Sequence, residues 1–345
     1  SLLLAIDGIE VNKMHGRDKI LIPCESALHV ACEEGHASVP LLLAVNGIDV
    51  NQLDRDGNTA LYRAASHGAV EAVESMLGAD GIDVNKGKTT PFFIACQHRH
   101  RCVAVVTMML QKGGIDVNRQ ATGRSRHGHG AAFLSHGDAL GAFGFNTPLS
   151  SLALVHVNGE STHLVALLLK KGGVDVNKPD ERGCSPLFCA CETGHTEMVK
   201  LLLAHGRAFL NQTGETDRSP LGIAALRGHA DIVAQLLGAN GVNVNLRDRD
   251  GCSPLYAACS KGHTEVVRLL LGREDVDINA ASKRGTPPLS IASKLGHVGA
   301  MSLLLSRKDI LVNQVDDRGA SALLFASENG ETKAVALLLR IKGVN

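Results

Sequence analysis

The sequence predicts an all-α solenoid, a stack of similar helix–turn–helix units with protruding β-hairpin loops. The first observation is a short phrase, Gly-Ile-Asp-Val-Asn or a near copy, that returns ten times along the 345 residues. The copies end at Asn12, Asn51, Asn85, Asn118, Asn177, Asn211, Asn245, Asn279, Asn313 and Asn345. Successive asparagines lie 39, 34, 33, 59, 34, 34, 34, 34 and 32 residues apart. A period of about 34 residues indicates stacked units that share their core with their neighbours.

The second observation is the order of signals within one period, here residues 248–279. Gly251 supplies the positive φ of a tight turn, and Ser253-Pro254 then begins a helix with a hydroxyl cap and a proline at its first position. Gly262 ends this short helix of small residues. The apolar spacing over 266–271 predicts a second helix with a wide apolar face, so two helices are expected in every unit.

The residues of this unit carry a family resemblance. Ser253-Pro-Leu-Tyr-Ala-Ala-Cys-Ser-Lys-Gly-His263, followed by Glu265-Val-Val-Arg-Leu-Leu-Leu271, resembles the ankyrin repeat, whose signature is a T-P-L-H-x-A helix start followed by Gly-His. Similar starts occur at Ser26, Thr59, Ser185, Ser219, Pro287 and Ser321, and degenerate ones near Thr90 and Thr147. The resemblance implies one array, 1–345, consisting of a stub at 1–12 and repeats at 13–51, 52–85, 86–118, 119–177 with an insertion at 120–145, 178–211, 212–245, 246–279, 280–313 and 314–345. Because residues 1–12 match 40–51 almost letter for letter, we expect a piece of a longer array.

Composition excludes several classes of function. The 35 basic and 35 acidic side chains balance, so general polyanion binding gains no support. Trp is absent, and Phe and Tyr together number only ten, too few for the stacking surface that nucleic acids need. No apolar run reaches the length of a membrane span, and no secretory signal is visible. We expect a protein partner, no nucleic acid and no membrane span.

The cysteines indicate a reducing compartment. Cys32, Cys96, Cys191 and Cys259 follow the Ala of an Ala-Cys pair and occupy one repeat position, which holds Ala65, Ala225, Ser293 or Ser327 in other units. A position that exchanges Cys, Ala and Ser requires a small buried side chain, not a disulfide or a metal ligand. We therefore expect reduced thiols and an intracellular, cytoplasmic location.

No pattern supports catalysis. His36, His195, His229, His263 and His297 each follow a glycine at the same repeat position, which favours a structural hydrogen bond near the start of the second helix. No nucleophile elbow, zinc-protease, phosphate-loop or dinucleotide signature occurs in a supporting context. We expect no enzyme, no catalytic residue, no cofactor and no metal. The insertion, with its basic first half and three histidines, is open to three interpretations: a partner-binding finger, a weak metal site or a Gly-rich loop without a role in binding.

Binding is expected on the groove that the resemblance implies, formed by hairpin tips and the outer side of the first helices. Basic residues gather there in the sixth to eighth repeats, which suits carboxylates or phosphates. The candidate partner-binding residues are Arg182, Arg218, Arg227, Arg249, Lys261, Lys283, Arg284 and Lys294, with Arg124 and Arg126 in the insertion. The competing interpretation is a solvated mixed-charge surface, because Glu215, Asp217 and Asp250 are interspersed.

The sequence thus predicts a protein–protein interaction scaffold that binds a partner protein or an acidic peptide segment. The alternative is a targeting or regulatory module of a larger enzyme or channel. The resemblance also implies a possible modification, because Asn51, Asn177 and Asn245 stand in the context that a 2-oxoglutarate-dependent asparaginyl hydroxylase accepts in ankyrin repeats.

Overall fold

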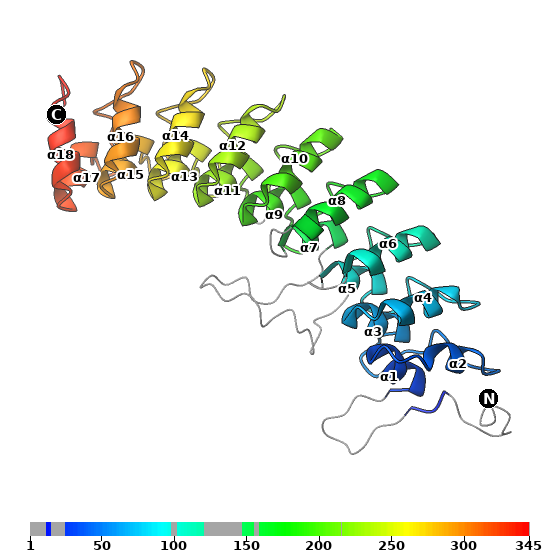
Figure 1. Cartoon of the computed structure of the whole chain (residues 1–345). Helices are drawn as coiled ribbons and strands as arrows, with labels where there is room; N and C mark the ends of the chain where they lie inside the picture. Colours follow the sequence, from blue (N-terminus) through cyan, green and yellow to red (C-terminus); the bar gives the residue numbers. More distant parts are fainter. Residues whose placement is uncertain are drawn as a thin grey trace. The chain divides into compact units, whose positions relative to one another are not determined.

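The computed structural model describes residues 12–14, 25–97, 102–120, 147–154, 159–214 and 216–344. Over these ranges the chain forms eighteen α-helices and no β-strand. Each interval between successive Asn-terminated phrases contains two helices. The fold is therefore the all-α repeat solenoid that the 34-residue period predicts (Figure 1).

The chain divides into two compact units, residues 1–181 and 182–345, here called the N-terminal and the C-terminal unit. The N-terminal unit contains α1 (Ala27–Glu33), α2 (Val39–Leu43), α3 (Ala60–His67), α4 (Val70–Gly78), α5 (Pro91–Gln97), α6 (Cys102–Lys112), α7 (Pro148–Leu154) and α8 (Gly159–Lys171). The C-terminal unit contains α9 (Pro186–Thr193), α10 (Thr196–His205), α11 (Pro220–Arg227), α12 (Ala230–Leu237), α13 (Pro254–Lys261), α14 (Thr264–Leu271), α15 (Pro288–Lys294), α16 (Val298–Leu305), α17 (Ala322–Glu328) and α18 (Thr332–Leu338).

Within each unit the helices form two layers. The first helices of successive repeats pack against one another, from α9 through α11, α13 and α15 to α17 in the C-terminal unit. The second helices, α10 through α18, form the other layer in the same way, and each pair also packs internally. Figure 1 shows these helix pairs of the C-terminal unit side by side, coloured from green to red. Each repeat thus completes the core of its neighbours.

The predicted helix signals act as expected in the C-terminal unit. The hydroxyl of Ser253 accepts a hydrogen bond from the backbone N–H of Tyr256 at 3.2 Å, and Pro254 occupies the first turn. Ser185, Ser219 and Ser321 cap their helices in the same way. Gly262 ends α13 in the left-handed conformation, with φ of 70°. The cap and the glycine therefore fix both ends of α13.

The position shared by Cys, Ala and Ser is buried between neighbouring first helices. Cys32, Cys191 and Cys259 are fully buried, and Cys96, Ala65, Ala225 and Ser293 are buried as well. Ser327, on α17, is exposed and is the exception. Burial raises the pKa of the Cys32 thiol to about 12 and shifts those of Cys191 and Cys259 upward too. These thiols are thus packing groups, as predicted.

The Asn-terminated phrase connects neighbouring repeats. Asn245 donates from Nδ2 to the carbonyl of Asp275 at 2.7 Å, and its Oδ1 accepts the backbone N–H of Asp277 at 2.8 Å. The Asp277 carboxylate in turn accepts the backbone N–H of Asn279 at 3.1 Å and shapes the local turn. Both amide bonds recur from Asn12, Asn51, Asn85, Asn118 and Asn211. The recurring asparagine is therefore an inter-repeat clamp.

The predicted β-hairpins are closed turns without strands in the described residues. An isolated bridge joins Leu53 and Thr59. In the seventh repeat Asp248 N–H donates to the carbonyl of Cys252 at 3.0 Å, and Lys283 N–H of the next turn donates to Asp250 at 2.9 Å. Five-residue turns closed by so few bonds are too short for a ladder. The insertion at 120–145 lies, apart from Gln120, outside the described residues.

Candidate protein-binding surface

The predicted basic residues of the C-terminal unit lie at two levels of the stack. Arg227, Lys261 and Lys294 occupy the last turns of α11, α13 and α15. Arg249 and the pair Lys283-Arg284 lie in the turns that precede α13 and α15. An eight-residue helix is about 12 Å long, so the two levels are separated by about the length of α13. The structure therefore spreads these cations along the first-helix layer.

Arg218 is part of the scaffold and not of a free surface. Its guanidinium forms an ion pair with Asp248 of the next repeat, and Nε lies 3.2 Å from the carboxylate. The Asp248 side chain is only 2 % exposed, and its other oxygen accepts the backbone N–H groups of Asp250 and Cys252. A partner that took Arg218 would leave this buried carboxylate unpaired, which is costly. Arg218 is thus already engaged within the scaffold, unlike a cation free to meet a partner.

Three more predicted cations have acidic partners within the C-terminal unit. Arg182 Nη1 and Arg227 Nη2 approach the two oxygens of Glu192, at 3.3 and 3.5 Å. Glu192 is 11 % exposed, so this shared contact is partly shielded from water. Arg249 Nε lies 3.5 Å from the Asp217 carboxylate, and both side chains are well exposed. A solvated pair of that kind contributes little and is easily exchanged for another partner.

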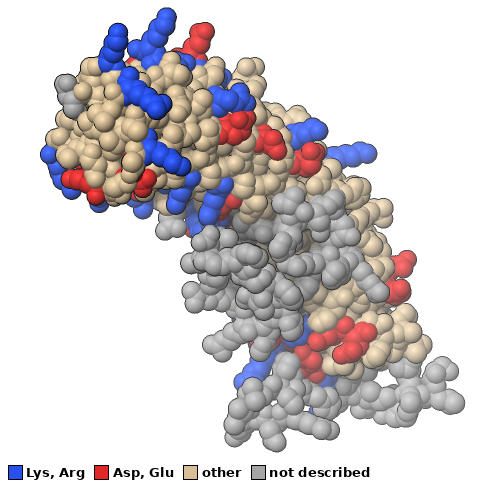
Figure 2. Space-filling view, turned by 60° about the vertical axis from the view of Figure 1, so that its left-hand side comes forward, with Lys and Arg blue, Asp and Glu red and all other residues tan. Residues whose placement is uncertain are grey.

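Lys261, Lys283 and Arg284 differ from these residues. All three are exposed, and within the described residues none of them forms an ion pair. Lys294 lies over the ring of Phe325, with Nζ 5.7 Å from the ring centre. We call these four residues the basic surface. Figure 2 shows basic and acidic side chains interspersed over one face of the molecule.

Arg124 and Arg126 of the insertion lie outside the described residues. Two candidates for asparaginyl hydroxylation, Asn51 and Asn245, use both the nitrogen and the oxygen of the side-chain amide as inter-repeat clamps. Asn177 follows the same turn, and its backbone N–H donates to Asp175 Oδ1 at 3.0 Å.

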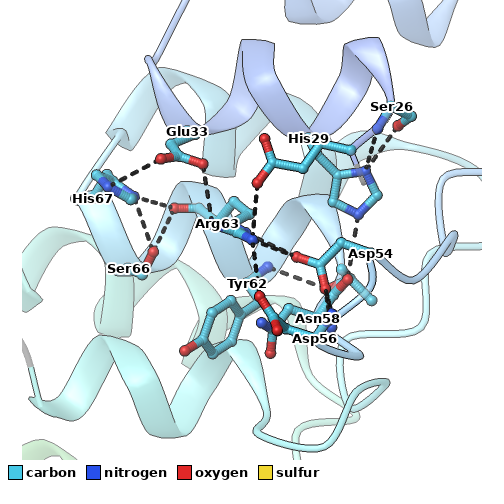
Figure 3. Close-up of polar contacts among 12 residues, drawn as sticks. Ser26, His29, Glu33, Asp54, Asp56, Asn58, Tyr62, Arg63, Ser66 and His67 are labelled. Atoms are coloured by element: carbon cyan, nitrogen blue, oxygen red, sulfur yellow. Dashed lines mark hydrogen bonds and ion pairs between the residues drawn. The ribbon is translucent and has the colours of Figure 1, made fainter. Parts of the chain in front are cut away.

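Sequence reasoning missed a polar cluster in the N-terminal unit. Arg63 on α3 lies among Glu25, Glu33, Asp54 and Asp56, at 3.0, 3.2, 2.7 and 3.9 Å (Figure 3). The Arg63 side chain is 14 % exposed, and that of Asp54 is fully buried. The only sequence signal is that Arg63 replaces the small or apolar residue, such as Ala257 or Ile291, of other repeats.

Burial and charge compete within this Arg63 cluster. Burial raises the pKa of Glu25, and neighbouring Arg63 only partly offsets that shift. Glu25 Oε1 lies within ion-pair distance of Arg63 without hydrogen-bond geometry. Burial alone would lower the pKa of Arg63, but its hydrogen bond to Asp54 and the other carboxylates leave that pKa raised. The four carboxylates thus surround and bind Arg63, and the cluster stabilises the contact between α1 and α3.

Two of the repeated histidines, His229 and His263, link successive repeats. His263 precedes α14 without capping it, and its Nε2 lies 3.1 Å from the carbonyl of Leu226 in the preceding repeat. His229 contacts the carbonyl of Glu192 in the same manner at 3.4 Å. Burial lowers the pKa of His229. The structural role predicted for these two histidines is therefore right, but each bond spans two repeats, whereas both ring nitrogens of His195 are buried without a hydrogen-bond partner among the described residues.

The described residues contain neither a metal-binding cluster nor a helix fit to cross a membrane. No group of three or more His, Cys, Asp or Glu side chains there is arranged to hold a metal ion. None of the described helices combines the length and apolarity that crossing a membrane requires.

Comparison with known proteins agrees with this architecture. The family profile described as Ankyrin repeats (3 copies) matches residues 3–88, 28–121, 152–248, 208–282 and 274–345. These matches cover most of the chain, which therefore belongs to the ankyrin-repeat family. Ankyrin repeats are protein-interaction modules, so the chain belongs to the class of protein-binding repeat arrays.

Two curated plant proteins are similar to part of the chain. The E3 ubiquitin-protein ligase XBAT33 of Arabidopsis thaliana is 35 % identical over 85 residues, 24 % of this chain and 17 % of that protein. The protein named Probable E3 ubiquitin-protein ligase XBOS33, of Oryza sativa subsp. japonica, is 28 % identical over 174 residues, 49 % of this chain and 29 % of that protein. The similarity thus spans less than a third of either relative.

Proposed function

We propose that this chain is an interaction scaffold that binds a partner protein through an acidic peptide segment docked on the basic surface. The proposal is supported by the exposure of Lys261, Lys283 and Arg284, none of which forms an ion pair within the described residues. These side chains can meet carboxylates or phosphates without losing an internal contact. Arg218, by contrast, is held by buried Asp248.

The proposal is tested by charge reversal. The double variant Lys261→Glu/Arg284→Glu is compared with Lys308→Glu/Lys333→Glu, which reverses two exposed lysines outside the first-helix layer. Binding of a fluorescein-labelled acidic peptide is followed by anisotropy at low and high ionic strength. We expect affinity to fall at least about tenfold in the first variant, since two attractive pairs become repulsive. Equal affinity in both variants would contradict the proposal.

A second candidate is that the array is the targeting or regulatory module of a larger enzyme or channel. The two relatives named as E3 ubiquitin-protein ligases favour an enzyme of that class. If so, Lys261→Glu/Arg284→Glu in the full-length protein should lower ubiquitin transfer to the bound partner while self-modification continues. An unchanged transfer rate to the partner would count against this role for the basic surface.

We further propose that the array residues have no catalytic role and act in a reducing intracellular compartment. Buried Cys191 and Cys259, whose pKa values are raised, support the first point because a protonated buried thiol is neither a nucleophile nor a metal ligand. Both thiols are also free of disulfide bonds, which supports the second point. Mass spectrometry after treatment with an asparaginyl hydroxylase tests whether Asn51, Asn177 and Asn245 become hydroxylated. Modification of Asn51 or Asn245 would require the inter-repeat bonds to open first.

A further inference from the structure

The first helices of the C-terminal unit end in a row of exposed side chains. Arg227, Lys261, Leu295 and Asn329 lie 34 residues apart and therefore share one repeat position. All four are exposed, and Leu295 is 43 % exposed. We call Arg227, Lys261 and Leu295 the helix-end row. Two cations are followed by one apolar side chain in consecutive repeats.

The helix-end row is held in register by the scaffold. Helices α11, α13 and α15 pack side by side, as Figure 1 shows. Next to Arg227, the carbonyl of Leu226 meets His263 Nε2 at 3.1 Å, which ties the end of α11 to the next repeat. The left-handed glycines that follow Arg227 and Lys261 fix the point at which each helix ends. The spacing along the row is therefore set by helix packing and not by mobile loops.

That spacing matches an extended peptide. Packed helices lie about 8–10 Å apart. A peptide in the extended polyproline II conformation advances about 3.1 Å per residue with three residues per turn, so about three peptide residues cover one repeat and every third side chain faces the same way. A peptide laid along the row would present every third side chain to successive repeats.

We propose that the helix-end row binds an extended segment with the pattern acidic-x-x-acidic-x-x-apolar, or its reverse, depending on chain direction. The acidic side chains meet Arg227 and Lys261, and the apolar one meets Leu295. This inference rests on the proposed function and adds the register in which the acidic segment is recognised. Lys294, next to Leu295 and over Phe325, is a further cation that an acidic side chain at the apolar end would meet. Arg227 already contacts Glu192, so Lys261 and Leu295 contribute most.

The pattern favours a peptide over a nucleic acid. Phosphates repeat along a nucleic acid strand without an apolar side group, so they offer nothing to Leu295. A base would require a stacking ring, and the row itself contains no aromatic residue. A mixed acidic and apolar peptide meets all three positions.

The test uses two labelled peptides of identical composition, net charge and length. In the spaced peptide the two acidic residues and the leucine stand three apart, and in the permuted peptide the acidic residues are adjacent. We expect the spaced peptide to bind the unaltered chain more tightly by about fivefold, which corresponds to one well-placed exposed ion pair. Lys261→Glu should weaken the spaced peptide by at least that factor, and Lys308→Glu should leave it unchanged.

Leu295→Ser isolates the apolar position. It should weaken the spaced peptide about fivefold, yet have no effect on a version in which serine replaces the peptide leucine, since only an apolar pair loses buried area. Equal affinity for the spaced and permuted peptides would overturn the register while the basic surface stands, provided Lys261→Glu still weakens both. If neither peptide binds, or a single-stranded oligonucleotide binds more tightly than both and is weakened by Lys261→Glu, the proposed function fails as well.

Discussion

A glycine-to-alanine substitution tests the contact between the histidine of one repeat and the glycine of the preceding one. Gly228 ends α11 with φ of 80°, and a Cβ there would lie 2.6 Å from Cε1 of His263. The ring is held in that place by the carbonyl of Leu226. Gly206, which ends α10 with φ of 72°, has no atom within 4 Å of such a Cβ. The two glycines share a conformation and differ in what packs against them.

The left-handed conformation costs alanine about 1 kcal/mol at either site. At Gly228 the overpacked ring adds about 1–3 kcal/mol, and a displaced His263 also loses its hydrogen bond. We therefore expect Gly228→Ala to lower the free energy of unfolding by about 3 kcal/mol and Gly206→Ala by about 1 kcal/mol. The two changes act on the same unit and the same type of helix end, so their difference measures the contact.

The assay is urea denaturation followed by circular dichroism, with amide hydrogen exchange of α11 to α14 to locate the loss. Local exchange is needed because repeat arrays do not always unfold in one step. Adding His263→Ala to Gly228→Ala should cost less than the sum of the single losses, since removal of the ring relieves the clash. Equal losses for Gly228→Ala and Gly206→Ala would refute the packing argument.

Four further predictions concern the scaffold. Asn245→Ala removes both amide bonds of a clamp and should lower the free energy of unfolding by about 1–3 kcal/mol, measured by urea denaturation, and speed amide exchange in the following loop. Arg63→Met leaves the buried carboxylate of Asp54 unpaired and should cost about 3 kcal/mol by the same assay; a loss below about 1 kcal/mol would contradict the assignment. Burial raises the pKa of Glu25 in the folded chain, so the contribution of Glu25 to stability is fully present below pH 4.5 and is lost as pH rises through its folded pKa. The variant Glu25→Gln should therefore gain stability relative to the unaltered chain between pH 4 and pH 7, as measured by thermal melts. Cys259 should resist Ellman's reagent at pH 8 in the folded chain and react in urea, whereas reaction at equal rates would show that its burial is wrong.

The repeat position of a residue predicted its role well where the scaffold decides that role. The Cys259 position was predicted as small and buried, and it is, because first helices of adjacent repeats pack directly over it. The helix limits followed from Ser253 and Gly262, whose preferences are local. In contrast, His263 bonds a carbonyl 37 residues earlier, which no local pattern reveals.

The candidate surface was predicted only as a list of charges. Arg218 and Lys261 look equivalent in the sequence, yet one is consumed by Asp248 of the next repeat and the other is exposed without an ion pair in the described residues. The Arg63 cluster escaped notice because its carboxylates come from three separate segments around Glu25, Glu33 and Asp54. Ion pairing depends on distances across repeats, which spacing along the chain does not supply.

The sequence by itself determined the architecture of this protein: a 34-residue period, two helices per repeat and a small buried position between them. Local turn and cap preferences, repeated many times, leave one way to stack. The tertiary structure decided which charges remain for a partner. It showed that the recurring asparagines clamp neighbouring loops, and that Arg227, Lys261 and Leu295 form a row set by helix packing. The physical reason is that charge availability is settled by contacts between repeats, and these exist only once the repeats are stacked.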